Sequence, residues 1–257
     1  MATTPAPDPL PLRGRRALVT GASRGLGAAT ARGLAAAGAD VALLCRRRAE
    51  EAAGTARAIR ELGRDCEVLL ADVADWEACR AAVESAASRL GGLDIVVANA
   101  GVANPHVSLA DTPVDRWRKI MGVNLDGPFH TVKAAAPWLT GSPHGSVVFV
   151  SSVGGLRAAP MQAAYGAAKA ALGHLARSWA AELAPLGVRV NTVVPGLFRT
   201  DMTQLLRQAR PDGGDGLVPL GRVGAPAELA DAVVYLCSDA ASYITGAELP
   251  VDGGMSA

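Results

Sequence analysis

The chain has 257 residues, of which 50% are hydrophobic and 19% charged, and its formal net charge at pH 7 is +1. This composition excludes an intrinsically disordered chain, and the near-neutral charge gives no overall indication of nucleic-acid binding. The four cysteines and four histidines follow no metal-ligand spacing, so we expect no metal site and reduced thiols. Without an apolar run of roughly 18 residues or a signal-peptide pattern, we expect a cytoplasmic protein with no membrane partner.

Seven short runs of β-branched and aliphatic residues alternate with longer, alanine-rich stretches of helical character. Because these runs are almost continuously hydrophobic, they are typical of strands covered by helices on both faces. The predicted strands cover residues 17–20, 41–45, 67–71, 94–98, 146–151, 188–194 and 248–251. This alternation predicts an α/β fold with a doubly wound parallel sheet, which binds ligands at the edge where its strands end.

The domain organisation is simple, because no linker rich in proline, glycine or serine divides the chain. We expect a flexible, proline-rich lead-in over residues 1–12 and one domain over residues 13–257. The irregular segment 197–220 carries a PDGGDG cluster and places Met202, Leu205 and Leu206 at helical spacing. It is interpreted as a short mobile lid over the site, with an ordinary surface excursion as the alternative.

A glycine-rich segment directly follows the first predicted strand and leads into an alanine-rich helix. Glycine permits a sharp turn and a close approach to a pyrophosphate, and the helix N-terminus offers free N–H groups to phosphate oxygens. A simple tight turn would also use glycine, but the strand–turn–helix context favours a dinucleotide site. The predicted cofactor-binding residues of this segment are Gly21, Ser23, Arg24, Gly25, Leu26 and Gly27.

The residues after the second predicted strand indicate which dinucleotide is bound. This strand ends at Cys45, where a site that prefers NAD would place an acidic side chain against the ribose 2′-hydroxyl. Arg46, Arg47 and Arg48 follow at once. Guanidinium groups bind a 2′-phosphate through charge-assisted hydrogen bonds, and Arg24 could reach the same ribose. The pattern predicts NADP(H) rather than NAD(H), although Arg47 and Arg48 also fit a solvated helix start.

Two further strand ends carry candidate cofactor contacts. Asp72 and Val73 follow the third predicted strand, where the Asp72 carboxylate could accept a hydrogen bond from the adenine amino group or cap a helix. Asn99, Ala100 and Gly101 follow the fourth strand and offer small residues where the backbone must lie close to a cofactor. A plain turn would use the same residues.

A tyrosine and a lysine four residues apart, Tyr165 and Lys169, begin a long predicted helix that runs to about Leu183. Residues at this spacing share a helix face, so the ammonium should favour the phenolate. We therefore expect the pKa of Tyr165 to fall toward the range of a general acid–base at neutral pH, with Lys169 also reaching the nicotinamide ribose. Such pairs are common on protein surfaces, and the pair alone is weak evidence.

Ser152 and Asn124 make the pair more specific. Ser152 lies at the end of the fifth predicted strand, directly after Ser151 and thirteen residues before Tyr165, so its hydroxyl could orient a substrate oxygen beside the phenol. Asn124 is an amide in an apolar helical stretch, where it could hold a water that links Lys169 to solvent. A buried, hydrogen-bonded amide with no catalytic part is the alternative for Asn124.

Together these motifs resemble the classical short-chain dehydrogenase/reductase family, from about Arg13 to Ser256. The resemblance rests on residues 20–27, Asp72, Asn99, Ala100, Gly101, Asn124, Ser152, Tyr165, Lys169, Pro195 and Gly196. It implies a single-domain Rossmann fold with a seven-stranded sheet and a catalytic tetrad of Asn124, Ser152, Tyr165 and Lys169. It also implies cofactor contacts from Pro195 and Gly196, and from Thr200 to the nicotinamide carboxamide. Ala98 and Gly166 depart from residues frequent in the family without removing a catalytic group.

Residues 219–254 are similar to family members related to 3-oxoacyl-carrier-protein reductases and sugar-acid dehydrogenases. That similarity implies a homotetramer whose interfaces use the helices of Asn124 and Tyr165 and the last strand. The expected function is an NADP(H)-dependent oxidoreductase that interconverts a ketone and a secondary alcohol. An epimerase or dehydratase of the extended family would need a larger C-terminal domain than this length provides.

The expected substrate pocket is mostly apolar, which favours a hydrophobic or mixed ketone over a phosphorylated one. Its predicted residues are Ser152, Val153, Gly154, Met161, Gln162, Tyr165 and Leu197, with the lid above them. A 3-oxoacyl thioester, a polyketide, terpenoid or steroid ketone and a sugar acid remain open as substrates. A non-catalytic regulator that senses NADP(H) remains the alternative of another class.

Overall fold

The seven predicted strands form one parallel sheet in the order β3-β2-β1-β4-β5-β6-β7, within the residues that the computed structural model describes, 10–103 and 107–257. The strands are β1 Arg16–Thr20, β2 Asp40–Cys45, β3 Cys66–Leu70, β4 Ile95–Ala98, β5 Ser146–Val150, β6 Arg189–Pro195 and β7 Glu248–Val251. Chain order reverses between β1 and β4, and at such a switch point the loops that follow the strands diverge and leave a crevice. The predicted α/β, doubly wound seven-stranded Rossmann fold is confirmed.

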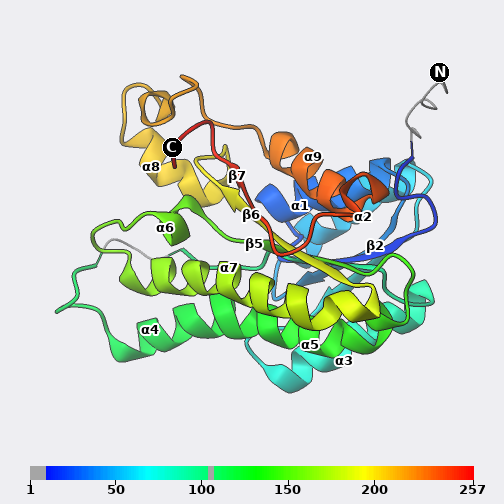
Figure 1. Ribbon diagram of the computed structural model, residues 1–257. Helices are drawn as coiled ribbons and strands as arrows, with labels where there is room; N and C mark the ends of the chain where they lie inside the picture. The colour runs from blue at the N-terminus through cyan, green and yellow to red at the C-terminus, as the bar shows by residue number, and fades with distance from the viewer. Residues whose placement is uncertain (1–9, 104–106) are drawn as a thin grey trace.

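Helices cover both faces of the sheet (Figure 1). On one face lie α1 Gly25–Ala36, α2 Ala49–Glu61 and α9 Pro226–Cys237, and on the other α3 Trp76–Leu90, α5 Gly127–Thr140 and α7 Ala163–Leu183. Each face has its own buried hydrophobic cluster, as the nearly continuous apolar strands predict. The shorter helices are α4 Val114–Met121, α6 Val153–Leu156 and α8 Gln204–Gln208.

The last residues of the expected lead-in, from Leu10 to Leu12, lie within the described part of the chain. Residues 1–9 of the expected lead-in lie outside the described part of the chain. Leu12, however, is fully buried, and its N–H donates to the carbonyl of Ala37 at 2.9 Å. Leu12, which falls within the expected lead-in, is thus part of the buried core, and the predicted domain bounds remain a prediction.

The helix that carries Asn124 is interrupted. Between α4 and α5 the backbone forms a π-helical turn, Gly122–Asp126, which an apolar helical pattern cannot distinguish from an ordinary α-helix. At the next residue, Gly127, a Cβ atom would lie 2.6 Å from Cγ2 of Val73. The glycine thus allows the start of α5 to pack directly against the loop that follows β3.

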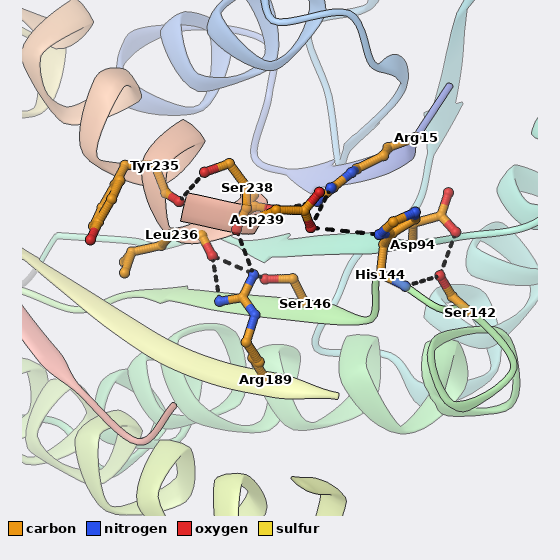
Figure 2. A network of polar contacts seen from close by, with 11 residues as sticks. Arg15, Asp94, Ser142, His144, Ser146, Arg189, Tyr235, Leu236, Ser238 and Asp239 are labelled. Atoms are coloured by element: carbon orange, nitrogen blue, oxygen red, sulfur yellow. Dashed lines mark hydrogen bonds and ion pairs between the residues drawn. The ribbon is translucent and has the colours of Figure 1, made fainter. Parts of the chain in front are cut away.

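A polar network occupies the amino-terminal edge of the strands, opposite the edge where they end (Figure 2). Arg15, at the start of β1, donates to the Cys237 carbonyl at 2.7 Å and pairs with Asp239 at 2.7 Å. Arg189, at the start of β6, donates to the Leu236 carbonyl at 2.7 Å. Cations at a helix C-terminus are favourable, so both arginines fasten the end of α9 to the sheet. The network thus ties α9 to the sheet at the edge opposite the one where the strands end.

Across the described residues, no helix combines the length and the hydrophobicity that crossing a membrane would require.

Candidate active site

A cavity of about 890 Å³ lies at the carboxyl-terminal edge of the sheet, bordered by the loops that follow β1, β2, β3, β4, β5 and β6. Every residue that the sequence predicts to contact the cofactor borders this cavity. The parallel strands bring most of them together, since these segments lie at or just after a strand end, whereas Tyr165 and Lys169 come from α7. The placement of the predicted residues follows from the topology, while their roles toward a cofactor remain predictions.

The glycine-rich loop is held by the turn after β4. The side-chain amide of Asn99 donates to the carbonyl of Thr20 at 2.8 Å and to that of Gly21 at 3.3 Å. A Cβ on Gly27 would collide with both the Asn99 side chain and the Gly21 carbonyl oxygen, and Gly21 itself has a φ of +66°. Residues 99–101 are therefore more than a plain turn: Asn99 fixes the shape of the loop, and glycine allows the close packing.

The N-terminus of α1 has the properties of an anion site. Arg24 precedes the helix, no described side chain caps its free N–H groups, and its first turn has no acidic residue. These N–H groups and the positive end of the helix dipole face the cavity, where they could bind phosphate oxygens. The loop, the helix end and the size of the cavity fit a dinucleotide.

The arginines predicted to bind a 2′-phosphate both border the cavity, and each already has a carboxylate partner. Arg46 donates to Oδ2 of Asp72 at 3.1 Å, and Arg24 pairs with Asp201 from the segment after β6. Both pairs are partly exposed, so water screens them and a phosphate could compete for the guanidinium groups. Asp72 does not cap α3, because that position belongs to Asp75, whose side chain accepts from Ala78 N–H at 3.0 Å.

Cys45, at the end of β2, packs against the glycine-rich loop. Its side chain is buried, and burial raises the pKa of the thiol, while the backbone N–H groups of Ala22 and Ser23 act in the opposite direction. The end of β2 therefore packs directly under the glycine-rich turn. An acidic side chain here would have to be buried, which is consistent with the basic residues that follow.

The tyrosine, serine and lysine predicted to act together meet at the other end of the cavity. Ser152 hydrogen-bonds with the Tyr165 phenol, and its hydroxyl also accepts from Gly154 N–H at 3.1 Å. Lys169 is buried, and its ammonium donates to the Val150 carbonyl at 2.7 Å. Ser151 points the other way and donates to the Lys169 carbonyl at 2.8 Å, which ties α7 to the end of β5.

The electrostatics differ from the expected pattern. Burial raises the pKa of Tyr165, and the hydrogen bond from Ser152 only partly offsets this effect. Burial also lowers the pKa of Lys169 from 10.5 to about 8. The expectation that Lys169 lowers the tyrosine pKa is wrong for this structure: the lysine nitrogen lies 5.9 Å from the centre of the phenol ring, and desolvation dominates.

Asn124 is fully buried and lies just behind the cavity wall. Its Oδ1 accepts from Val102 N–H at 2.8 Å and its Nδ2 donates to the Val102 carbonyl at 3.0 Å. The side chain thus holds the loop after β4, as a buried, satisfied amide would. A Cβ on Gly101 would lie 3.1 Å from Oδ1 of Asn124 and 3.7 Å from Nζ of Lys169, so the amide and the ammonium flank the same glycine. The predicted water-holding role remains a prediction.

The substrate side of the cavity contains most of the residues predicted for it. Val153, Gly154, Gln162 and Leu197 border the cavity with Ser152 and Tyr165. Met161 lies outside the described lining; its backbone adopts a φ of +63° and its side chain is half-exposed. Sequence reasoning missed Arg157, Ala158 and Met255, which do border the cavity. A lone arginine and the last residues of a chain give no periodic signal.

The segment expected to act as a lid lies against this side. It forms a short turn, Asp201–Thr203, followed by α8, and both Met202 and Leu206 border the cavity. Leu205 is 81% exposed and points away from it. The base of the segment is fixed, because Leu197 and Val218 belong to one small buried cluster against which Met255 packs. Motion of the segment remains a prediction.

Among residues 10–103 and 107–257, no three His, Cys, Asp or Glu side chains gather as metal ligands would.

Comparison with known proteins places this fold and site in a family. The profile of the family described as enoyl-(acyl carrier protein) reductase matches residues 21–256. Sorbose reductase of Schizosaccharomyces pombe is 39% identical over 246 residues, which cover 95% of this chain and 96% of that protein. Cis-4-hydroxycyclohexanecarboxylate dehydrogenase of Sinomonas cyclohexanicum is 40% identical over 243 residues, covering 95% and 97%.

The structural likeness agrees. The crystal structure of carveol dehydrogenase from Mycobacterium avium in complex with NAD superposes with a TM-score of 0.90 at 35% identity, covering 95% of this chain and 98% of that one. The fold and the site define a Rossmann-type oxidoreductase that binds a nicotinamide dinucleotide. The chain belongs to the short-chain dehydrogenase/reductase family.

Proposed function

We propose that this protein is an NADP(H)-dependent oxidoreductase that interconverts a ketone and a secondary alcohol. One observation carries the proposal: Ser152, Tyr165 and Lys169 border the same cavity as the glycine-rich loop and the uncapped N-terminus of α1. A group that can move a proton therefore lies in the same cavity as a loop and a helix end that fit a dinucleotide.

The chemistry divides between the cofactor and this chain. A nicotinamide dinucleotide bound at the glycine-rich loop supplies or accepts the hydride. Tyr165 donates a proton to the carbonyl oxygen during reduction, and its raised pKa keeps the phenol protonated at neutral pH. Ser152, already hydrogen-bonded to this phenol, orients the same oxygen. Lys169 holds the end of β5 and lies behind the phenol ring.

The proton-transfer role is tested by Tyr165→Phe, with NADPH absorbance followed during the reduction of a panel of ketones. Loss of a positioned general acid should lower kcat by about 10²–10⁴-fold. Tyr235→Phe, a half-exposed tyrosine on α9, is the matched control and should retain full activity. Unchanged turnover in Tyr165→Phe would refute the mechanism. Binding of NADPH by the unsubstituted protein without turnover of any ketone would favour the alternative, a non-catalytic regulator that senses NADP(H).

The preference for NADP(H) is proposed from Arg46 and Arg24 at the cavity wall. Arg46→Ala should weaken NADPH binding about 10–100-fold, the value of one or two charge-assisted hydrogen bonds, and should leave NADH binding nearly unchanged. Arg57→Ala, an exposed arginine on α2, is the control. Equal affinity of the unsubstituted protein for NADPH and NADH would overturn the preference.

A homotetramer is proposed as the working assembly. Half-exposed Trp117 and Phe129 on α4 and α5 support it, because large aromatic side chains on helix faces are typical of interfaces. Size-exclusion chromatography with light scattering tests it directly, and a monomeric mass at working concentration would exclude it.

A further inference from the structure

We propose that the substrate carries a carboxylate, which the guanidinium of Arg157 binds at the substrate side of the cavity. The proposal rests on the proposed oxidoreductase function and adds a substrate class to it: ketones and alcohols that also bear an acid group.

Arg157 comes from the segment that also supplies a catalytic hydroxyl. It directly follows α6, five residues after Ser152, and borders the cavity together with Gln162 and Leu197. The short helix α6 packs on α7, and Gly155 makes this contact close: a Cβ there would lie 2.8 Å from the carbonyl carbon of Lys169. The position of Arg157 is therefore tied to the helix that carries Tyr165 and Lys169.

The charges around the cavity leave this cation without an acidic partner. Among the described residues that border it, the two carboxylates are Asp72 and Asp201, which pair with Arg46 and Arg24 in the cofactor half. The guanidinium of Arg157, which is exposed, makes no ion pair within the described chain and donates only to the carbonyl of Met255.

The acid closest in sequence to Met255 is also engaged elsewhere. The Asp252 carboxylate accepts from Gly254 N–H at 2.9 Å and from Ser256 N–H at 2.8 Å. The carbonyl contact uses one of the five N–H donors of the Arg157 guanidinium. The remaining donors have the planar geometry that matches a carboxylate through two parallel hydrogen bonds.

The surroundings make such a contact selective. The side chains that share this half of the cavity with Arg157 are mainly apolar and include Ala158, Leu197 and Leu206. The apolar part of the wall binds the carbon skeleton, and Arg157 is the described cation on this side of the cavity, so its guanidinium favours a carboxylate over the neutral ester. A charge-assisted hydrogen bond contributes more than a neutral one, which makes the acid the better substrate.

The test compares acids with their esters. The probes are 4-oxopentanoate, 5-oxohexanoate and 6-oxoheptanoate, each against its methyl ester, with NADPH oxidation as the readout. These chains vary the separation between carbonyl and carboxylate, so one of them should span from Tyr165 to Arg157. Because Arg157 is exposed and water screens its charge, we expect kcat/KM for that length to favour the acid by about 3–10-fold, mainly through KM.

Arg157→Leu should abolish this preference and leave the kcat/KM of the ester within about 3-fold of the unsubstituted enzyme, while Arg157→Lys should retain part of it. An equal loss for acid and ester would overturn the proposal, because Arg157 would then act only by holding Met255. Equal rates for acid and ester in the unsubstituted enzyme would overturn it as well.

Direct binding separates this proposal from the oxidoreductase assignment. If none of the probes turns over, saturation-transfer NMR with the three keto acids and NADP⁺ still reports whether they bind. Binding that Arg157→Leu removes would support the carboxylate site while the ketone chemistry fails. If none of the three acids binds, the carboxylate site is overturned. Turnover of the esters would still support the reductase.

Discussion

Replacement of Lys169 by methionine should stabilise the protein while it removes activity. The lysine is 4% exposed, and burial lowers the pKa of its ammonium from 10.5 to about 8. At pH 7 the group is protonated in both the folded and the unfolded chain, so the folded state carries the full cost of a buried charge. Methionine has a similar length, fills the same space and carries no charge.

The magnitude follows from the pKa. Each pKa unit corresponds to about 1.4 kcal/mol, so a fall from 10.5 to about 8 means that the charge costs the fold about 3 kcal/mol. Methionine also loses the hydrogen bond to the Val150 carbonyl, which is worth about 1 kcal/mol. We therefore expect Lys169→Met to raise the free energy of unfolding at pH 7 by about 2 kcal/mol.

Urea unfolding at several pH values measures this effect and its sign. Between about pH 8 and 10.5 the folded chain has released the Lys169 proton and the unfolded chain still holds it, so the unsubstituted protein gains stability as the pH rises. The advantage of Lys169→Met should shrink across this window. Lys119→Met, at an exposed position on α4, should change stability by less than about 0.5 kcal/mol. A constant difference between pH 7 and 10.5, or a destabilised Lys169→Met, would refute the reasoning.

Two further predictions concern positions away from the reacting groups. Burial alone would raise the pKa of Asp94, but hydrogen bonds from Arg16 and Ser142 hold it below 3.8. Asp94→Asn should therefore lower the free energy of unfolding at pH 7 by about 2–4 kcal/mol. Acid unfolding curves should show this difference diminish as the pH falls below about 3.8. Gly155→Ala should lower the free energy of unfolding by at least about 1 kcal/mol and also lower kcat, because the new Cβ would meet the backbone of α7. Gly54→Ala, with open space around it in α2, should instead raise the free energy of unfolding by up to about 1 kcal/mol. Thermal unfolding of both variants measures the difference.

The sequence was sufficient for the fold because buried parallel strands have a strong local signal. Each predicted strand lies within about one residue of its position in the sheet at both ends. The cofactor half of the site was predictable for the same reason: residues that directly follow parallel strands, such as Asp72 and Asn99, must meet at one edge.

Features that depend on burial in the folded protein could not be predicted from the sequence. The spacing of Tyr165 and Lys169 gives their shared helix face but not their desolvation, which sets the direction of both pKa changes. The π-helical turn around Asn124 and the positive φ of Met161 are local departures that the residue pattern does not signal. The proposed role of Arg157 has no signal in the sequence, because it depends on the lack of an acidic partner within the described cavity wall.

The two pKa changes have a joint consequence for the order in which the site loses its protons. In water, tyrosine and lysine side chains ionise at nearly the same pH, about 10 and 10.4. In this fold the lysine value falls to about 8 and that of the tyrosine rises, so Lys169 loses its proton well before Tyr165 does. The phenol therefore stays protonated over the neutral range, as the proposed reduction of a ketone would require. The reverse reaction, oxidation of an alcohol, would need the phenolate, whose formation burial of Tyr165 disfavours.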